Sequence, residues 1–232
     1  MNTWEVFKVL DNSECNKACG PDNIPSRFIH KFAYELAKPL TAIINCSFAQ
    51  HCVPFQWKRA ITVPVPKSVP ATVENLRPIA LTDHFAKVAE HFIAKETLKQ
   101  MECGLDPTQY GNRRGVSTSH CLIDSLHMLH FQAEQKKSVS SVLLTDFSKA
   151  LDRVDHTIAL TKLLNMGVSS SVVAWVADFL SDRVHRVRYG QSHLDWSPVY
   201  AGVPQGTKLG PVVFLAAVND INFNGANLGT SV

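Results

Sequence analysis

Apolar residues recur at the spacing of one helical turn along several stretches of the chain. Between Phe28 and Ile44 this spacing predicts one long amphipathic helix that bends near Pro39. The same pattern predicts helices over 83–100, 117–135, 157–166 and 170–180, with Ser117 or Thr118 as the N-cap of the second of these. Residues 212–218 are apolar throughout, which indicates a buried helix.

Other stretches have the pattern of strands. Residues 57–67, WKRAITVPVPK, contain β-branched runs interrupted by prolines, which favours an edge strand or a hairpin. Residues 141–145 predict a short apolar strand, and 183–190 alternate like a strand that 196–200 joins as a hairpin. Helices and strands do not follow one another as regular βαβ units. We therefore expect an α+β fold in which antiparallel strands are backed by helices.

Composition narrows the class of protein without deciding the function. The 232 residues are 45% hydrophobic and 19% charged, as in a globular protein with one sizeable core or two small ones. The net charge of +3 permits a local nucleic-acid-binding patch but does not demand one. The six cysteines form no CxxC pair, and neither a signal peptide nor a long apolar run is present. We expect an intracellular protein with reduced thiols and no membrane span.

The first candidate for chemistry is the segment LLTDFSKALDRVDH, in which Asp146 follows the predicted strand over 141–145. A carboxylate at the end of a buried strand costs desolvation energy unless it is compensated, and a divalent cation is a strong compensator. Magnesium prefers oxygen ligands of this kind. A helix cap or a turn explains the same aspartate without a metal.

Two further segments add to this candidate. GVPQGTKLGP, residues 202–211, predicts a turn that enters a helix, in which Gly206 lets the backbone approach a ligand and Gln205 has no role in the turn itself. In ENLRPIALT, Arg77 precedes a proline that holds the chain extended, which suits a phosphate-binding guanidinium. A surface arginine paired with Glu74 is the alternative.

In this order, the segments resemble the reverse transcriptases of non-LTR (LINE-like) retrotransposons. KACGPDNIPSRFIH is similar to the opening block of that family, and WKRAITVPVPK with NLRPIALTDHFAKVAEHFI is similar to its fingers region. QYGNRRGVSTSHCLI resembles the glycine, arginine and serine-threonine block. LLTDFSKALDRVDHTIALTKL resembles the first catalytic palm motif, and AGVPQGTKLGPVVFLAAVNDI resembles the glutamine-glycine motif.

The resemblance implies a right-hand polymerase fold. Residues 1–135 would form an N-terminal extension and the fingers, and 136–232 a partial palm, with no part similar to a thumb or an endonuclease. It also implies RNA-templated DNA synthesis with two Mg²⁺ ions, with an RNA template, a DNA primer and deoxynucleotides as partners, and a nuclear location.

The resemblance assigns roles to individual residues. Asp146 would be the first metal-binding aspartate and Phe147 would offer its backbone carbonyl, while Asp152 and Asp155 would be structural. Leu151 stands where the family usually has phenylalanine, under the nucleotide sugar, so its smaller side chain weakens exclusion of a ribose. The remaining positions are expected to contact nucleotide or template (Gln205, Gly206, Arg77, Arg113 and Lys67) or a nucleic-acid backbone (Arg186 and Arg188). A solvated strand face is the alternative for the last pair.

The second metal-binding motif of the family, an aspartate pair, does not occur in this sequence. One carboxylate does not balance two magnesium ions about 4 Å apart. The sequence therefore predicts a reverse transcriptase fragment, truncated before that motif, that does not polymerise DNA by itself. Two alternatives remain: a non-catalytic nucleic-acid-binding remnant of a mobile element, and an unrelated magnesium-dependent phosphohydrolase built around Asp146, which leaves Gln205 unexplained.

Overall fold

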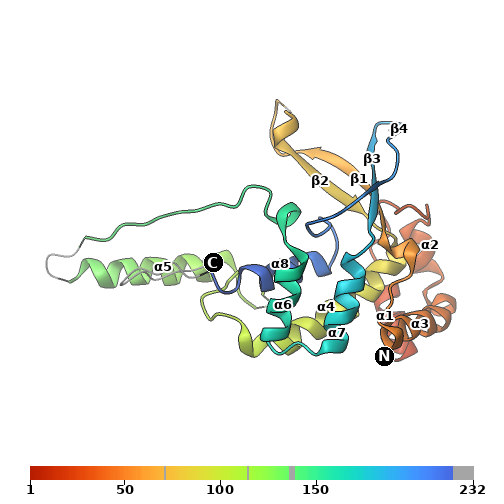
Figure 1. Ribbon diagram of the computed structural model, residues 1–232, viewed down its shortest axis with the longest axis horizontal. Helices are drawn as coiled ribbons and strands as arrows, with labels where there is room; N and C mark the ends of the chain where they lie inside the picture. Colours follow the sequence, from red (N-terminus) through yellow and green to blue (C-terminus); the bar gives the residue numbers. More distant parts are fainter. Residues whose placement is uncertain (71, 114, 136–138, 222–232) are drawn as a thin grey trace.

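The computed structural model describes residues 1–70, 72–113, 115–135 and 139–221. A body of helices carries a small group of strands that rises from one side (Figure 1). This arrangement confirms the expected α+β class. In the part of the chain that is described, no helix has the length and apolarity required to cross a bilayer.

The helices are α1 Thr3–Asp11, α2 Ser26–Lys31, α3 Ala33–Gln50, α4 His84–Met101, α5 Thr118–Ala133, α6 His156–Asn165, α7 Ser170–Leu180 and α8 Leu209–Val218. Short 3₁₀ turns are η1 Phe55–Lys58, η2 Val73–Asn75, η3 Glu102–Gly104 and η4 Ala150–Arg153. The strands are β1 Arg59–Pro66, β2 Leu76–Leu81, β3 Val184–Tyr189, β4 Ser192–His193 and β5 Ser197–Pro198.

Most of the predicted helices are confirmed. Helices α4, α6, α7 and α8 form where the apolar spacing placed them, and Gly167, at a φ of +84°, separates α6 from α7. Helix α5 begins after Ser117, whose backbone N–H donates to Nδ1 of His120 at 3.1 Å, so the predicted N-cap is also correct. The largest buried side chains include Trp175 and Phe179 of α7, which anchor the core.

The long helix predicted over 28–44 is wrong in its continuity. The helix is interrupted at Phe32, whereas Pro39 lies inside α3. The interruption lets Ile29 and Ala33 both reach the core, with 1% and 2% of their surface exposed. Phe28, expected on the buried face, instead packs against Phe32 at the surface, with ring centroids 4.7 Å apart and ring planes tilted by 46°.

The sheet has the order β2-β1-β3-β4, and β5 also pairs with β3. Strand β1 forms an antiparallel hairpin with β2, which was one of the two expectations, and it is also parallel to β3, so it is an internal strand and not an edge strand. Its pairing with β3 ends at Thr62, and Pro64 and Pro66 lie beyond that point, opposite β2 alone. The prolines are therefore tolerated because they lie where β1 has one neighbour. The predicted hairpin between 183–190 and 196–200 is confirmed by the β3–β5 pairing.

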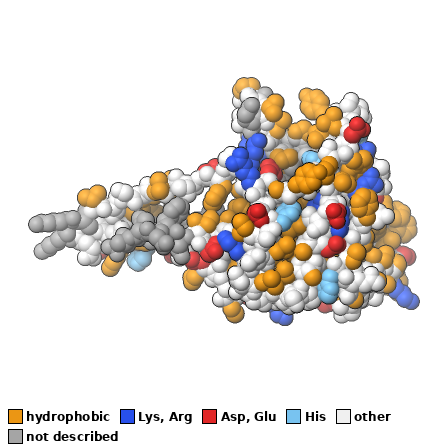
Figure 2. All heavy atoms as spheres, in the orientation of Figure 1, with side chains coloured by type: hydrophobic (Ala, Val, Ile, Leu, Met, Phe, Trp, Pro, Cys, Tyr) orange, Lys and Arg blue, Asp and Glu red, His pale blue; other side chains and the backbone are white. Residues whose placement is uncertain are grey.

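The strand predicted over 141–145 is wrong, because this segment is extended but unpaired. Val142, Leu143 and Leu144 are 62%, 80% and 90% exposed. Apolar residues form a strand when a neighbouring strand satisfies the backbone, and within the described residues none pairs with this segment. Helix α5 likewise projects from the body and has no buried residue (Figure 1). Hydrophobic side chains lie on the surface of this projection in Figure 2.

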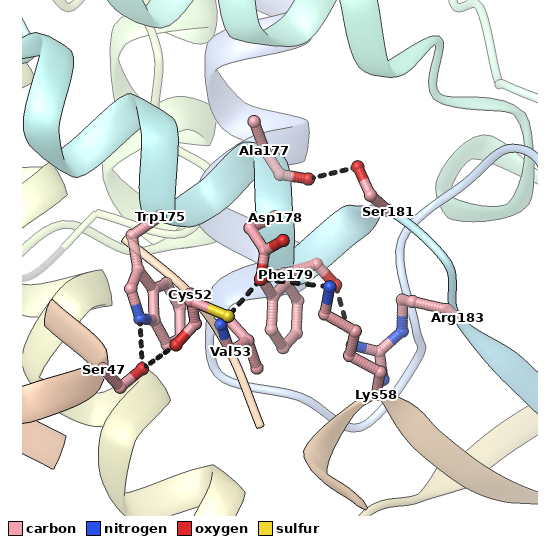
Figure 3. Close-up of polar contacts among 10 residues, drawn as sticks. All are labelled: Ser47, Cys52, Val53, Lys58, Trp175, Ala177, Asp178, Phe179, Ser181 and Arg183. Atoms are coloured by element: carbon pink, nitrogen blue, oxygen red, sulfur yellow. Dashed lines mark hydrogen bonds and ion pairs between the residues drawn. The ribbon is translucent and has the colours of Figure 1, made fainter. Parts of the chain in front are cut away.

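The strands are joined to the helical body through Asp178, near the end of α7 (Figure 3). Its carboxylate accepts a hydrogen bond from the backbone N–H of Val53 at 2.6 Å and pairs with the Nζ of Lys58 at 3.0 Å. The Lys58 side chain is only 8% exposed and leads directly into β1. Beside this pair, the indole of Trp175 donates to Ser47 Oγ at 2.9 Å. These contacts fix the start of β1 against α7.

The N-terminal segment docks on the start of α4 through Gly20 and Asp83. A Cβ on Gly20 would collide with the backbone of Asp83, so this approach requires glycine. Asp83 is 4% exposed and accepts a hydrogen bond from the backbone N–H of Asp22 at 3.1 Å. Burial raises the pKa of Asp83 from 3.8 to about 6, and the backbone N–H of Asp22 opposes that rise.

Replacing Asp178 with asparagine is expected to destabilise the fold by about 3 kcal/mol, because Lys58 is left buried without its counter-charge. Urea unfolding followed by circular dichroism measures the change. Asp182→Asn, an exposed site just after α7, is the matched control and should cost less than about 0.5 kcal/mol. Equal losses in the two variants would show that the buried ion pair does not fix β1 to α7.

Stability should also depend on the protonation of Asp83. Because its pKa is higher in the folded than in the unfolded chain, the folded state holds this proton more tightly. The free energy of unfolding should fall as pH rises from 3.8 to about 6. Asp83→Asn should remove this part of the pH dependence, whereas Asp11→Asn, at an exposed position on α1, should leave it unchanged. Chemical denaturation at a series of pH values provides the measurement, and parallel curves for wild type and Asp83→Asn would contradict the assignment.

Candidate functional site

The loop over 202–206 joins three separate parts of the chain. Its backbone N–H groups at Gly202 and Val203 donate to the carbonyls of Val154 and Leu151 at 2.9 and 2.7 Å, which ties the loop to η4 and the residue after it. Further along, the carbonyl of Gln205 accepts the backbone N–H of Ala80 at 2.7 Å, so the loop also continues the edge of β2. The loop therefore brings the predicted glutamine-glycine segment, the Asp152 region and β2 together.

Two glycines make this approach possible. Gly202 has a φ of +80°, and a Cβ there would lie 2.6 Å from the carbonyl oxygen of Asp152. Gly206 has a φ of +103°, and a Cβ there would lie 3.0 Å from the carbonyl oxygen of Ala80. A side chain at either position meets backbone that has no freedom to move aside. The sequence pattern predicted that Gly206 lets a ligand approach the backbone, whereas the contact in the structure is with the carbonyl of Ala80.

The side chain of Gln205 is held by Asp152. Its Nε2 donates to Asp152 Oδ1 at 2.9 Å, and both residues line a cavity of about 300 Å³. One wall of this cavity comes from alternate residues of the sheet, Ala60, Thr62, Pro78, Ala80 and His185. With its Nε2 engaged, the Gln205 amide has its carbonyl oxygen left to accept a hydrogen bond.

A hydroxyl and an imidazole supply further polar groups on the sheet wall. Thr62 Oγ1 lies 2.9 Å from Nδ1 of His185. Burial lowers the pKa of His185, so the ring is neutral at physiological pH and can both donate and accept. The cavity thus combines apolar walls with a few oriented hydrogen-bonding groups, as small-ligand sites do.

A buried polar cluster fixes the helix that follows the loop. Glu90 is fully buried in α4, and its Oε2 accepts the backbone N–H groups of Lys208 and Leu209 at 2.9 and 3.4 Å, at the start of α8. Burial raises the pKa of Glu90, and the positive charge of Arg183 opposes this rise. Arg183 is itself 2% exposed, and burial lowers its pKa to about 10. A carboxylate at a helix N-terminus satisfies otherwise unpaired N–H groups, so Glu90 determines where α8 begins.

Of the first palm motif, the residues expected to bind the metal and the nucleotide sugar lie outside the cavity. Asp146 and Phe147 belong to the exposed extended segment and do not line the cavity. Leu151 packs against the hydrophobic core, whereas its backbone carbonyl holds the loop. Asp155 is structural as expected, because its carboxylate caps α6 by accepting the N–H of Ile158 at 2.9 Å.

The arginines and the lysine predicted to contact nucleotide or template are dispersed. Arg77 is exposed on β2, one residue before the cavity-lining Pro78, and the alternation of a strand places it on the opposite face. Lys67 is exposed at the tip of the β1–β2 hairpin. Arg113 donates to the backbone carbonyls of Asp106 and Gln109, both at 3.2 Å, and thus supports its own loop.

Arg186 and Arg188 share one face of β3, as predicted, but it is the face opposite the cavity. His185 lines the cavity and contacts Thr62, so it marks the cavity side of β3. Because side chains alternate along a strand, both arginines point to the other side. Sequence reasoning missed His185 and the contact of Asp152 with Gln205. The alternation of 183–190 marked the faces of β3, but no sequence signal showed which face meets the loop.

Divalent metal ions are expected for polymerases, so the fit of the described residues to such an ion matters. Among these residues, no group of three or more acidic, histidine or cysteine side chains is placed to hold a metal. Asp146 is exposed, and the extended segment over 139–147 contains no second acidic residue. The described residues alone therefore do not make a complete divalent-metal site.

Replacing Gly202 with alanine is expected to destabilise the protein by about 3 kcal/mol, because the new Cβ combines backbone strain with a collision against Asp152. Gly190→Ala is the matched control, since Gly190 also has a positive φ, +58°, but a Cβ there meets nothing within 4 Å. That control should cost about 1 kcal/mol. Denaturant unfolding measures both variants. Losses of the same size would show that the loop does not depend on the close contact at Gly202.

Comparison with known proteins identifies the family of the chain. Residues 65–226 match the family described as "Reverse transcriptase (RNA-dependent DNA polymerase)". The chain is 30% identical, over 94% of its length, to the probable RNA-directed DNA polymerase from transposon X-element of Drosophila melanogaster. It is 26% identical over 94% of its length to the RNA-directed DNA polymerase from mobile element jockey of the same organism. A 28% identity over 73% of the chain links it to the Pol polyprotein of the type-1 retrotransposable element R2 of Popillia japonica.

The chain spans 24% of the length of each of these relatives. The family match covers β2, η4, β3 and the loop over 202–206, all of which line the cavity, whereas the cavity residues Ala60 and Thr62 of β1 precede it. The chain therefore belongs to the reverse transcriptase family, in the group of RNA-directed DNA polymerases of non-LTR retrotransposons.

Proposed function

We propose that this chain is the fingers and part of the palm of an RNA-directed DNA polymerase, and that the cavity beside Gln205 receives the incoming nucleotide and its template base. The observation that supports this most directly is the loop over 202–206, which joins the predicted palm and fingers segments around that cavity. Its apolar walls suit the flat faces of bases, and its few polar groups suit their edges.

Within the cavity, Asp152 acts as a positioning residue for Gln205. The hydrogen bond from Gln205 Nε2 to Asp152 Oδ1 holds the amide and leaves its carbonyl oxygen to accept from the ligand. Gly206, which is exposed and has no side chain, lets a base or sugar approach the backbone. Leu151, Arg77, Arg113 and Lys67 remain proposed contacts for the nucleotide or the template.

The proposed cofactor is Mg²⁺. Asp146 would supply one carboxylate and Phe147 a backbone carbonyl, both hard oxygen ligands of the kind that magnesium prefers. The two ions of this chemistry require more negative charge than one carboxylate supplies. The isolated chain is therefore proposed to bind nucleotide and template without extending a primer.

The proposed partners of the whole polymerase are an RNA template, a DNA primer and deoxynucleotides, acting in the nucleus. We also propose the division into an N-terminal extension with fingers over 1–135 and a partial palm over 136–232. The two regions are not separate in space, because β1 of the first pairs with β3 of the second over Arg59–Thr62 and Val184–Val187. The proposed fingers sheet thus takes a strand from each region.

Nucleotide binding tests the cavity. Titration of the chain with a fluorescent deoxynucleotide triphosphate in the presence of a short template RNA should show saturable binding. Gln205→Ala should weaken the binding about tenfold, corresponding to about 1.4 kcal/mol. Gln56→Ala, at an exposed position of η1, is the control and should bind like the wild type. Equal affinity in both variants would remove Gln205 from the site.

A non-catalytic nucleic-acid-binding remnant is the second candidate function, and the exposed, isolated position of Asp146 favours it. Saturable deoxynucleotide binding that depends on Gln205 separates the two, whereas RNA-templated primer extension by the purified chain tests the inactivity that both predict. We expect no incorporation by the chain or by Asp146→Ala. Incorporation that disappears in Asp146→Ala would show that the chain is a complete catalyst and would overturn the proposed inactivity.

A further inference from the structure

The sheet has a second face, which points away from the cavity wall formed by Thr62 and His185 and reaches the cavity only at Val184 and Pro198. The register of β3 with β5 pairs Val184 with Pro198 and His185 with Ser197, so Trp196 comes next, opposite Arg186. The parallel register of β1 with β3 places Arg59 opposite Val184, on this same face. Arg59, Arg186, Arg188 and Trp196 therefore share the face opposite the cavity, and we call these four residues the arginine–tryptophan face.

Trp196 holds both neighbouring guanidinium groups. The Cζ of Arg59 lies 4.1 Å from the centre of the Trp196 ring, and the Cζ of Arg186 lies 4.9 Å from it. Stacking on an indole fixes the direction of each guanidinium, so less side-chain entropy remains to be lost when a ligand binds. The ring thus holds two positive charges close together.

These charges have no acidic partner within ion-pairing distance in the described part of the chain. Among the described residues, the neighbouring Asp195 takes part in no ion pair, and the charge of Arg59 is the smallest of the influences on the pKa of Asp83. The Nε of Arg186 is buried and has no hydrogen-bond partner. An anion that reached this face would relieve the repulsion between the guanidinium groups.

We propose that the arginine–tryptophan face binds the phosphate backbone of a polynucleotide along a path separate from the cavity. Arg59 and Arg186 contact successive phosphates, Trp196 orients both guanidinium groups, and Arg188 extends the path along β3. This proposal goes beyond the nucleotide site at Gln205, because it uses the other side of the same sheet and needs no metal ion.

The geometry favours a phosphate backbone over other anions. Planar guanidinium groups bind phosphate with paired hydrogen bonds, and their separation along the strands suits a ligand with repeated charges better than a single ion. Both guanidinium groups lie over the indole, so the ring positions their charges and has little surface left to stack on a base. The face should therefore bind with strong salt dependence and little preference for sequence.

The experiment measures binding of a labelled single-stranded RNA to the complete chain by fluorescence anisotropy over a range of salt concentrations. For a single strand, each lost phosphate contact lowers the slope of log K against log salt by about 0.7. The double variant Arg59→Gln/Arg186→Gln should lower the slope by about 1.4 and weaken binding about 20-fold at 0.1 M salt. Arg27→Gln, on the exposed surface of α2, is the single-charge control and should change the slope little.

Further variants control for misfolding and distinguish RNA binding at this face from nucleotide binding in the cavity. Arg188→Gln, at a residue that is in none of the cation–π pairs of the described chain, should lower the slope by about 0.7 without changing the melting temperature. Gln205→Ala should leave the salt slope unchanged, so failure of the nucleotide site and failure of this proposal give different results. Absence of RNA binding, slopes equal to that of Arg27→Gln, or equal binding of an acidic peptide would overturn the proposal.

Discussion

The close packing of the loop over 202–206 against two other segments is the constraint on which the rest of the site depends. Hydrogen bonds from this loop reach η4 on one side and Ala80 of β2 on the other, so one short connection determines how three distant parts of the chain meet. This contact requires the missing side chains of Gly202 and Gly206. After the loop, Glu90 fixes the start of α8 by accepting the backbone N–H of Lys208, so the chain is held on both sides of Gly206.

The small sheet separates two kinds of chemistry because a strand points successive side chains to opposite sides. On the cavity side, Thr62 and His185 form a short polar contact among apolar neighbours. On the other side, stacked arginines present unpaired positive charge. Parallel pairing of β1 with β3 places both sets of residues at fixed distances from one another. A polymerase that must hold a small nucleotide and a long strand has use for both surfaces.

The sequence was a good guide to the helices and to the family, and a poorer guide to tertiary contacts. The apolar period of α4, α6, α7 and α8 is decided locally, so their positions could be predicted. The segment over 141–145 has strand composition but lacks a strand partner in the described chain, which a local pattern does not reveal. The same limit applies to Asp152, whose role comes from a partner 53 residues away in the sequence. Arg113 was assigned by motif, whereas its observed contacts are to its own loop.

The prolines of β1 also affect how the protein behaves at high concentration. The N–H of Lys67 points toward β2, so the alternate positions Pro64 and Pro66 face the side of β1 left open beyond Thr62. Proline has no N–H to offer, and this edge is therefore a poor template for a strand from another molecule. Unwanted self-association should begin instead at the apolar surfaces of α5 and residues 142–144. Polar substitutions made to keep the protein monodisperse therefore belong on those surfaces and not on the hairpin.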